Sequence, residues 1–286
     1  MRLAKVTPLL LMVLCPLLWA DRPGERARGP EKVDNIAPEE AAEVVETFRN
    51  QRLAGDYIFI FDLEHRPQRA KKQMFRGIMW GTWNQEGPIS RISIWPTGNR
   101  ATATRELLVQ GGPNPRIWEL KEGKVVELDA EEQGKPFFEG IVYSPYDILM
   151  PFTYWEDYDY IGSKRMIQGR PAHGFKFHAP EDVSERVEGL ESVEMWLDAD
   201  FYSPIRAAML DADGDELRTM GNPSFKEIRE QYIVKEVEIM DERTRDYTIF
   251  RVTNAALQQH LDPAIFTPEG LDDGEPDIGK VMFDPV

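Results

Sequence analysis

The four histidines are the side chains best suited to acid–base or metal chemistry, and they are His65, His173, His178 and His260. His173 and His178 lie five residues apart in HGFKFH, which alternates like a strand, so their rings point to opposite faces. That is poor geometry for one metal ion, and the chain contains no HExxH arrangement. We therefore interpret the histidines as structural or surface residues.

The acidic stretch DADGDE (211–216) resembles the beginning of a calcium-binding loop. Such a loop needs glycine at its sixth position and an acidic residue at its twelfth. Here these positions hold Glu216 and Asn222, so the calcium pattern fails. A hairpin turn at Asp213-Gly214 explains the stretch better.

Nucleophile and phosphate-binding signatures are also missing from the sequence. It contains no GxSxG, no P-loop and no GxGxxG, and its one cysteine is Cys15. Pairs of carboxylates suited to glycoside hydrolysis cannot be singled out, because the chain has 50 acidic residues. The sequence therefore predicts no catalytic residues, no metal site and no cofactor.

Aromatic residues are the conspicuous feature that remains. Core packing explains most of them. A single curled sheet covered by only a few helices, however, tends to leave an apolar cleft, which suits a hydrophobic ligand. These residues are Trp80, Trp83, Trp95, Trp118, Tyr154, Trp155 and Trp196, together with Phe59, Phe61 and Phe152.

Strand patterns dominate the elements that would position these side chains. A helix is predicted over 37–55, with Pro38 in its first turn and an apolar stripe at helical spacing (Ala41, Val44, Val45 and Phe48). About ten or eleven antiparallel strands follow, mostly as successive hairpins, one of which turns around Glu122-Gly123-Lys124. Apolar and polar side chains alternate along these strands, as at Ile92, Ser93 and Ile94. This alternation predicts that one face of the sheet is apolar and the other is solvent-exposed.

The interruption at residues 143–160 is the candidate cover for the apolar face. Ser144 is placed to cap a helix with Pro145 behind it, and Pro151 should divide the segment into two short pieces. The expected fold class is α+β, mainly antiparallel β. We predict a strongly curved, incomplete β-barrel with a helical lid on its concave apolar face.

Residues 1–20 have the layout of a secretory signal peptide, and residues 21–36 form a charged lead-in rich in Pro and Gly that we expect to be flexible. A membrane anchor and a lipid-modified Cys15 are the alternatives for the leader. The net charge is −16, and loss of Arg2 and Lys5 with the leader makes it −18. Such a surface repels nucleic acid. We expect the mature protein to be an exported, periplasmic monomer.

The stretches VEMWLDADFYSPIRAAMLDADGDELRTM, VKEVEIMDERTRDYTIFRV and LDPAIFTPEGL resemble outer-membrane lipoprotein-sorting proteins, the LolA-like superfamily. The resemblance covers most of residues 37–271, predicted as one half-barrel domain, and is followed by an acidic tail, 272–286. It implies a cavity for acyl chains of lipoproteins or lipids. It also implies a membrane-associated donor or acceptor protein as partner.

The predicted function is thus a periplasmic carrier that binds acyl chains under its lid and is not an enzyme. The alternatives are an RseB-like lipid sensor and an exported hydrolase with an unrecognised site. The predicted ligand-binding residues share an apolar side chain on the lid or on a strand facing it: Phe59, Phe61, Ile92, Ile94, Leu149, Phe152, Trp155, Phe175, Phe177, Met195 and Leu197.

Overall fold

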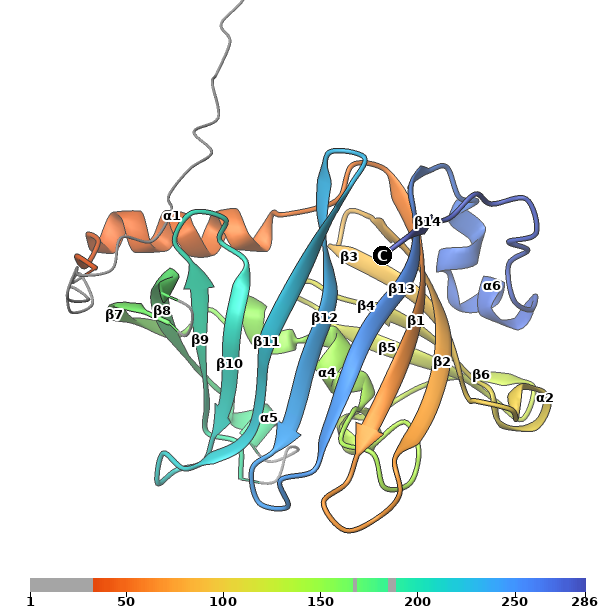
Figure 1. Ribbon diagram of the computed structural model, residues 1–286, viewed down its shortest axis with the longest axis horizontal. Helices are drawn as coiled ribbons and strands as arrows, with labels where there is room; N and C mark the ends of the chain where they lie inside the picture. Colours follow the sequence, from red (N-terminus) through yellow and green to blue (C-terminus); the bar gives the residue numbers. More distant parts are fainter. Residues whose placement is uncertain (1–32, 167–168, 185–188) are drawn as a thin grey trace, which may run out of the picture. The chain divides into compact units, whose positions relative to one another are not determined.

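Antiparallel strands occupy most of the chain between residues 56 and 259 (Figure 1). The computed structural model describes residues 33–166, 169–184 and 189–286, all within one structural unit. The predicted signal peptide and most of the predicted lead-in lie outside the described residues.

The strands are β1 (Asp56–Arg66), β2 (Gln73–Trp83), β3 (Pro88–Pro96), β4 (Arg105–Gln110), β5 (Arg116–Lys121), β6 (Lys124–Glu127), β7 (Tyr158–Arg165), β8 (Pro171–His178), β9 (Ser192–Asp198), β10 (Pro204–Leu210), β11 (Glu216–Ile228), β12 (Gln231–Asp241), β13 (Tyr247–Gln259) and β14 (Asp284–Pro285). The helices are α1 (Pro38–Arg49), α2 (Arg100–Ala103), α3 (Ala130–Gly134), α4 (Pro145–Leu149), α5 (Glu181–Ser184) and α6 (Pro268–Asp272), with 3-10 turns η1 (Pro151–Tyr154) and η3 (Pro263–Phe266).

In the described part of the chain, fourteen strands form one sheet in the order β6-β5-β4-β3-β2-β1-β13-β12-β11-β10-β9-β8-β7, with β14 paired to β13. The end strands β6 and β7 do not pair, so the curved sheet stays open, and the predicted half-barrel fold is confirmed. The sheet has more strands than the predicted ten or eleven. One reason is the β11–β12 turn, where Arg229 and Glu230 take the left-handed conformation (φ 50° and 63°) in place of the expected glycine or asparagine.

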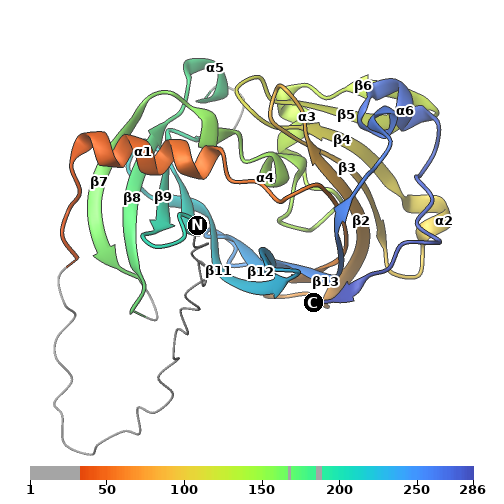
Figure 2. The same cartoon turned by 90° about the horizontal axis from the view of Figure 1, so that it is seen from above.

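Helix α1 begins at Pro38 as predicted and buries Ala41, Val44 and Val45. It ends at Arg49, earlier than the predicted range, because Asn50 leaves helical geometry at φ −96° and ψ 0°. Leu53 therefore lies beyond the helix, where it packs against the core of the sheet. In Figure 2, α1 crosses the strands β7, β8 and β9.

The two faces of the sheet differ from the prediction of one apolar and one wet face. The inner face, which is the concave one that faces α4, is apolar along the whole sheet. The outer face is also apolar over β1–β5, where Ile58, Trp80 and Leu108 pack with Phe266 and Leu271. Figure 2 shows α6 on this outer side and α4 on the inner side. The C-terminal residues thus cover part of the face that alternation assigns to water.

Buried Arg91 holds the C-terminal cover, residues 261–286, against the outer face. Its guanidinium donates to the carbonyl oxygens of Gly270 (2.6 Å) and Gly274 (2.7 Å), and it pairs with Glu106 at 3.3 Å. The carbonyls at the end of α6 lack helical partners, so an arginine satisfies them with charge-assisted hydrogen bonds. One side chain therefore joins strand β3 to the C-terminal segment at residues 270–274.

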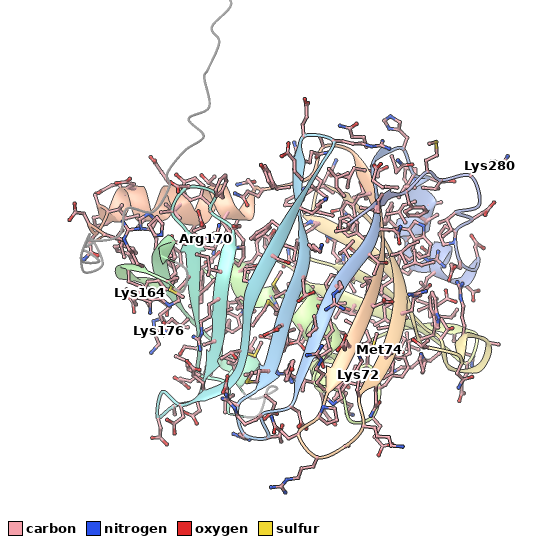
Figure 3. All side chains as sticks on the ribbon, in the orientation of Figure 1. Lys72, Met74, Lys164, Arg170, Lys176 and Lys280 are labelled. Atoms are coloured by element: carbon pink, nitrogen blue, oxygen red, sulfur yellow. The ribbon has the colours of Figure 1, made fainter. Side chains whose placement is uncertain are left out.

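Away from this apolar cluster, toward the Arg66 end of β1, the outer face carries ion pairs. Glu64 on β1 contacts Arg66, Lys72 and Arg251, and Figure 3 places Lys72 at the lower end of β2. Burial opposes ionisation of Glu64, but hydrogen bonds from Lys72 and Arg66 outweigh it and lower the pKa of the carboxyl. This part of the outer face matches the wet surface that alternation predicts.

Candidate binding face and its lid

The lid, residues 143–155, consists of α4 and η1 and lies on the inner face. As predicted, it forms two short pieces, with Pro145 opening the first and Pro151 the second. Met150 joins them in the left-handed conformation, φ 44° and ψ 55°. The proline cannot continue the helix, so the chain must turn there.

The side chains of the lid fill the inner face. Leu149 packs with one apolar cluster, around Phe61, Ile92 and Ile94, whereas Phe152 and Trp155 pack with a second cluster. The second cluster includes the predicted residues Phe175, Phe177, Met195 and Leu197. Ten of the eleven predicted ligand-binding residues are buried, and Phe59 is half-buried. The structure thus brings all eleven to one face, and their role in ligand binding stays a prediction.

The space left between lid and sheet is small. A cavity of about 10 Å³ lies beside Phe152 and Asp147, lined from the sheet by Met209, Arg218 and Ile239 among others. That volume holds about one water molecule. An acyl chain can therefore reach this part of the face only if the lid moves.

An ion pair links the lid to strand β11 of the sheet. Arg218 Nη1 on β11 donates to both carboxylate oxygens of Asp147, at 2.7 and 2.8 Å. Asp147 also accepts from the amide and hydroxyl of Ser144, both at 2.7 Å. The Asp147 side chain is 1% exposed and that of Arg218 24%. The Asp147 side chain raises the pKa of Arg218, and the guanidinium makes both hydrogen bonds of the pair charge-assisted.

Helix α1 holds the other end of the lid. Arg49, its last residue, donates from Nε to the carbonyl oxygen of Thr153 and from Nη2 to that of Trp155, both at 2.7 Å. These are carbonyls at the end of η1, where helical partners run out. The lid is therefore held through a few polar contacts in addition to its apolar ones.

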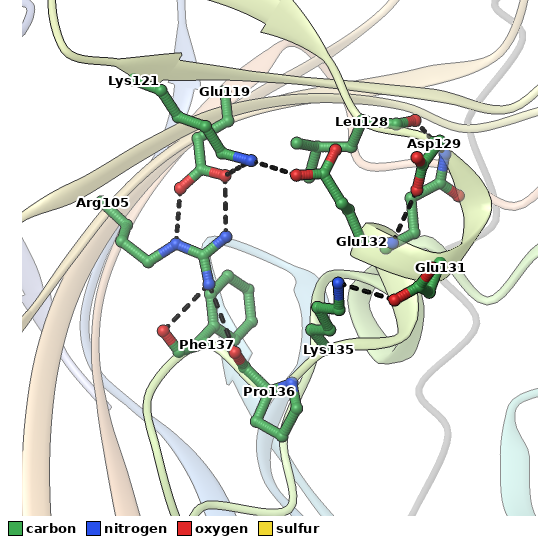
Figure 4. A network of polar contacts seen from close by, with 11 residues as sticks. Arg105, Glu119, Lys121, Leu128, Asp129, Glu131, Glu132, Lys135, Pro136 and Phe137 are labelled. Carbon is green, nitrogen blue, oxygen red and sulfur yellow. Dashed lines mark hydrogen bonds and ion pairs between the residues drawn. The ribbon is translucent and has the colours of Figure 1, made fainter.

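A polar network fixes the chain before the lid (Figure 4). Arg105 on β4 binds both oxygens of Glu119 on β5, at 2.6 and 2.9 Å, and donates to the carbonyl oxygen of Phe137 at 2.9 Å. Lys121 bridges Glu119 and Glu132. Glu119 is 5% exposed and Arg105 21%, so this pair is partly shielded from water, whereas Lys121 and Glu132 lie at the surface. Movement of the lid is thus expected beyond Phe137.

Sequence reasoning missed the polar partners of the lid, Asp147, Arg218 and Arg49. The spacing of Ser144 and Asp147 fits a capping box, in which an acidic residue follows the cap by three, and this signal was available. No comparable signal marks Arg218. It shares the inner face with Met220 by plain alternation, but a charged side chain in a strand is ordinarily assigned to the solvent-exposed face.

His65 and His178 contact polar side chains on neighbouring strands. His65 Nδ1 lies 3.0 Å from the hydroxyl of Thr248, and His178 Nε2 lies 2.9 Å from a carboxylate oxygen of Asp159. Burial lowers the pKa of His65 and of His173, which keeps both rings neutral near pH 7. Among the described residues, no three His, Cys, Asp or Glu side chains are grouped to hold a metal ion. The Asp213-Gly214 hairpin turn is confirmed between β10 and β11.

One serine–histidine contact lies beside a surface cleft of about 430 Å³. Ser163 Oγ is 2.7 Å from His173 Nδ1 and 2.7 Å from the hydroxyl of Tyr160. The amide of Ser163 donates to the side chain of Asn35, so it is not free to stabilise an oxyanion. Within the described chain, no hydrogen bond joins His173 to a carboxylate. These contacts tie residues 35–36 to β7 and β8.

The chain is similar to one family model and to several solved structures. Residues 123–273, more than half of the chain, match a family model described as "-like: Uncharacterized protein". The chain belongs to this family. No curated protein matches the chain. Among its described helices, none has the length and apolar content needed to span a membrane.

Three solved structures share the fold of this family member. A DUF1329 family protein from Desulfovibrio piger has a TM-score of 0.67 at 13% identity, covering 82% of this chain and 98% of that one. A domain assigned to outer membrane lipoprotein-sorting proteins, from Vibrio parahaemolyticus, has 0.64 at 14%, covering 82% and 97%. A LolA superfamily protein from Nitrosomonas europaea has 0.58 at 13%, covering 79% and 97%. The fold is therefore LolA-like, as the sequence resemblance predicts.

Proposed function

We propose that this protein binds and carries acylated ligands, lipoproteins or lipids, on the inner face of its half-barrel. The observation that supports this proposal is that the apolar inner face is filled by a short segment of the same chain. Leu149, Phe152 and Trp155 occupy the place that an acyl chain would take. In the proposed cycle the lid leaves, and the ligand replaces it.

Burial of the lid side chains and burial of an acyl chain contribute free energies of similar size. Burial of one large apolar side chain stabilises by about 2 kcal/mol, so the three lid side chains together contribute about 6 kcal/mol. Burial of one methylene group contributes about 0.8 kcal/mol, so about eight methylenes balance these side chains. A longer acyl chain can therefore displace the lid, and the lid in turn favours release.

The closed lid also carries local costs that favour its opening. The hydroxyl of Tyr146 is buried without a hydrogen-bond partner among the described residues, and burial raises the pKa of this group. An unpaired buried hydroxyl costs about 1–3 kcal/mol. The left-handed conformation of Met150 adds roughly 1 kcal/mol. The lid is thus held less tightly than an equally buried part of the sheet.

Location and partners complete the proposal. The signal-peptide pattern of residues 1–20 supports export to the periplasm. A carrier that shields an acyl chain in water must receive it from one membrane and deliver it to another, so we propose a membrane-associated donor or acceptor protein as partner. The likeness in fold to a domain assigned to lipoprotein sorting supports this role.

Native mass spectrometry tests the proposal. The protein would be titrated with a synthetic lipopeptide that carries two palmitoyl chains, and separately with the same peptide lacking acyl chains. We expect a one-to-one complex with the acylated peptide and none with the bare peptide. Absence of a complex with either peptide would overturn the proposal, and equal binding of both would assign the site to the peptide instead.

A further inference from the structure

Arg218 places a positive charge within the apolar inner face. Its side chain lines the gap beside Phe152 together with Met209, Met220 and Ile239. Its carboxylate partner Asp147 belongs to the lid, not to the sheet. Movement of the lid therefore removes the anion and leaves the cation on the face.

The neighbouring strand β12 offers a poor replacement for Asp147. Asp241 on β12 is the register partner of Arg218 and interacts with it electrostatically. Its Oδ1 already accepts from the amides of Arg243 (2.9 Å) and Thr244 (2.8 Å), in the turn that leads to β13. A guanidinium that is three-quarters buried and loses its partner is costly. When the lid is open, binding of a new anion at Arg218 would therefore be stabilising.

We propose that Arg218 binds the anionic head of an acyl-bearing ligand, so that the ligand class is an anionic amphiphile with a carboxylate or phosphate next to its chain. This inference rests on the proposed function. In the closed state the lid imitates such a ligand, with Asp147 in place of the head and Leu149 and Phe152 in place of the chain. The ligand replaces both parts at once, and Arg218 exchanges one anion for another.

Three probes with ten carbon atoms each test the head group: decanoate, decyl phosphate and decan-1-ol. Their affinities would be measured by calorimetry on the full protein. We expect decanoate, decyl phosphate or both to bind about tenfold or more tightly than the alcohol, because a hydrogen bond to a charged group contributes about 1.5–3 kcal/mol. The better of the two anions identifies the head group.

Variants assign the preference to one residue. Arg218→Met should bind the alcohol and lose the preference for the anion, whereas Arg218→Lys should retain part of it. Asp147→Asn removes the competing carboxylate and should raise anion affinity more than alcohol affinity. Arg206→Met is the matched control, because Arg206 pairs with Glu216 at 2.6 Å outside the lid contacts. Circular dichroism would establish that each variant is folded.

The outcomes separate this inference from the proposed function. Equal binding of anions and alcohol would overturn the anionic head group and leave an acyl-binding protein. A preference that persists in Arg218→Met would overturn the assignment to Arg218. Failure of every probe and of the lipopeptide would overturn the proposed function, and this inference with it.

Discussion

Asp147 and Arg218 are 71 positions apart in the chain, and their side chains meet at 2.7 Å across the inner face. The contact joins the lid to the sheet at a place that is almost closed to water. In a structure whose lid is otherwise held by apolar packing and by Arg49, this pair supplies a directional contact that one substitution can remove.

Loss of this pair should loosen the lid. Asp147→Asn leaves Arg218 without its anion, and breaking a buried pair costs about 3 kcal/mol. We expect faster chymotrypsin cleavage between residues 143 and 155 and a lower urea midpoint. Glu216→Gln is the control, because it removes the partner of Arg206 at an exposed pair worth less than about 1 kcal/mol. Equal cleavage of the two variants would show that the pair does not hold the lid.

Close packing of Phe61 on Gly77 should make that glycine sensitive to substitution. A Cβ atom at Gly77 would lie 2.3 Å from the ring of Phe61, which is fully buried. Gly77→Ala is therefore expected to lower the free energy of unfolding by about 1–3 kcal/mol through overpacking. Urea denaturation measures this, with Gly134→Ala as control because nothing lies within 4 Å of its added Cβ. A loss no larger than that of the control would contradict the packing.

The C-terminal cover should depend on Arg91. Arg91→Met leaves the carbonyls of Gly270 and Gly274 without their donors, and we expect a loss of about 3 kcal/mol in the free energy of unfolding. Hydrogen exchange should speed up in residues 261–286 before the rest of the sheet. Lys135→Met, at an exposed pair with Glu131, should change neither quantity measurably. Unchanged exchange in the C-terminal residues would show that apolar contacts alone hold the cover.

The stability of the protein should fall as the medium becomes acidic. Burial lowers the pKa of His65, so the unfolded chain binds more protons than the folded one below the unfolded value of about 6.5. The stabilisation is therefore present above that pH and is lost as pH falls through the folded pKa. We expect His65→Asn to show a smaller loss of stability between about pH 7.5 and pH 5. His260→Asn, at an exposed site, should keep the slope of the parent protein.

Much of the fold could be predicted because the signals are local. Pro145 and Pro151 divide the lid into two pieces by removing helical donors, and alternation along the strands identifies the inner face. The outer cover could not be predicted, because Phe266 and Leu271 lie in a Pro- and Gly-rich stretch without helical or strand periodicity. Arg218 was missed because a charged side chain is ordinarily assigned to the solvent-exposed face, although it alternates with inward-facing Met220. Its partner Asp147 lies 71 positions away, and one sequence does not reveal such a pairing.

Hydrogen exchange of the lid, with and without the dipalmitoylated lipopeptide, tests the central claim most directly. If the ligand replaces the lid, amides of residues 143–155 should exchange faster in the complex, whereas those of β8 and β9 should keep their protection. Equal or slower exchange of the lid in a complex that has formed would contradict displacement. The acyl chains would then bind elsewhere, and the inner face would be an ordinary core.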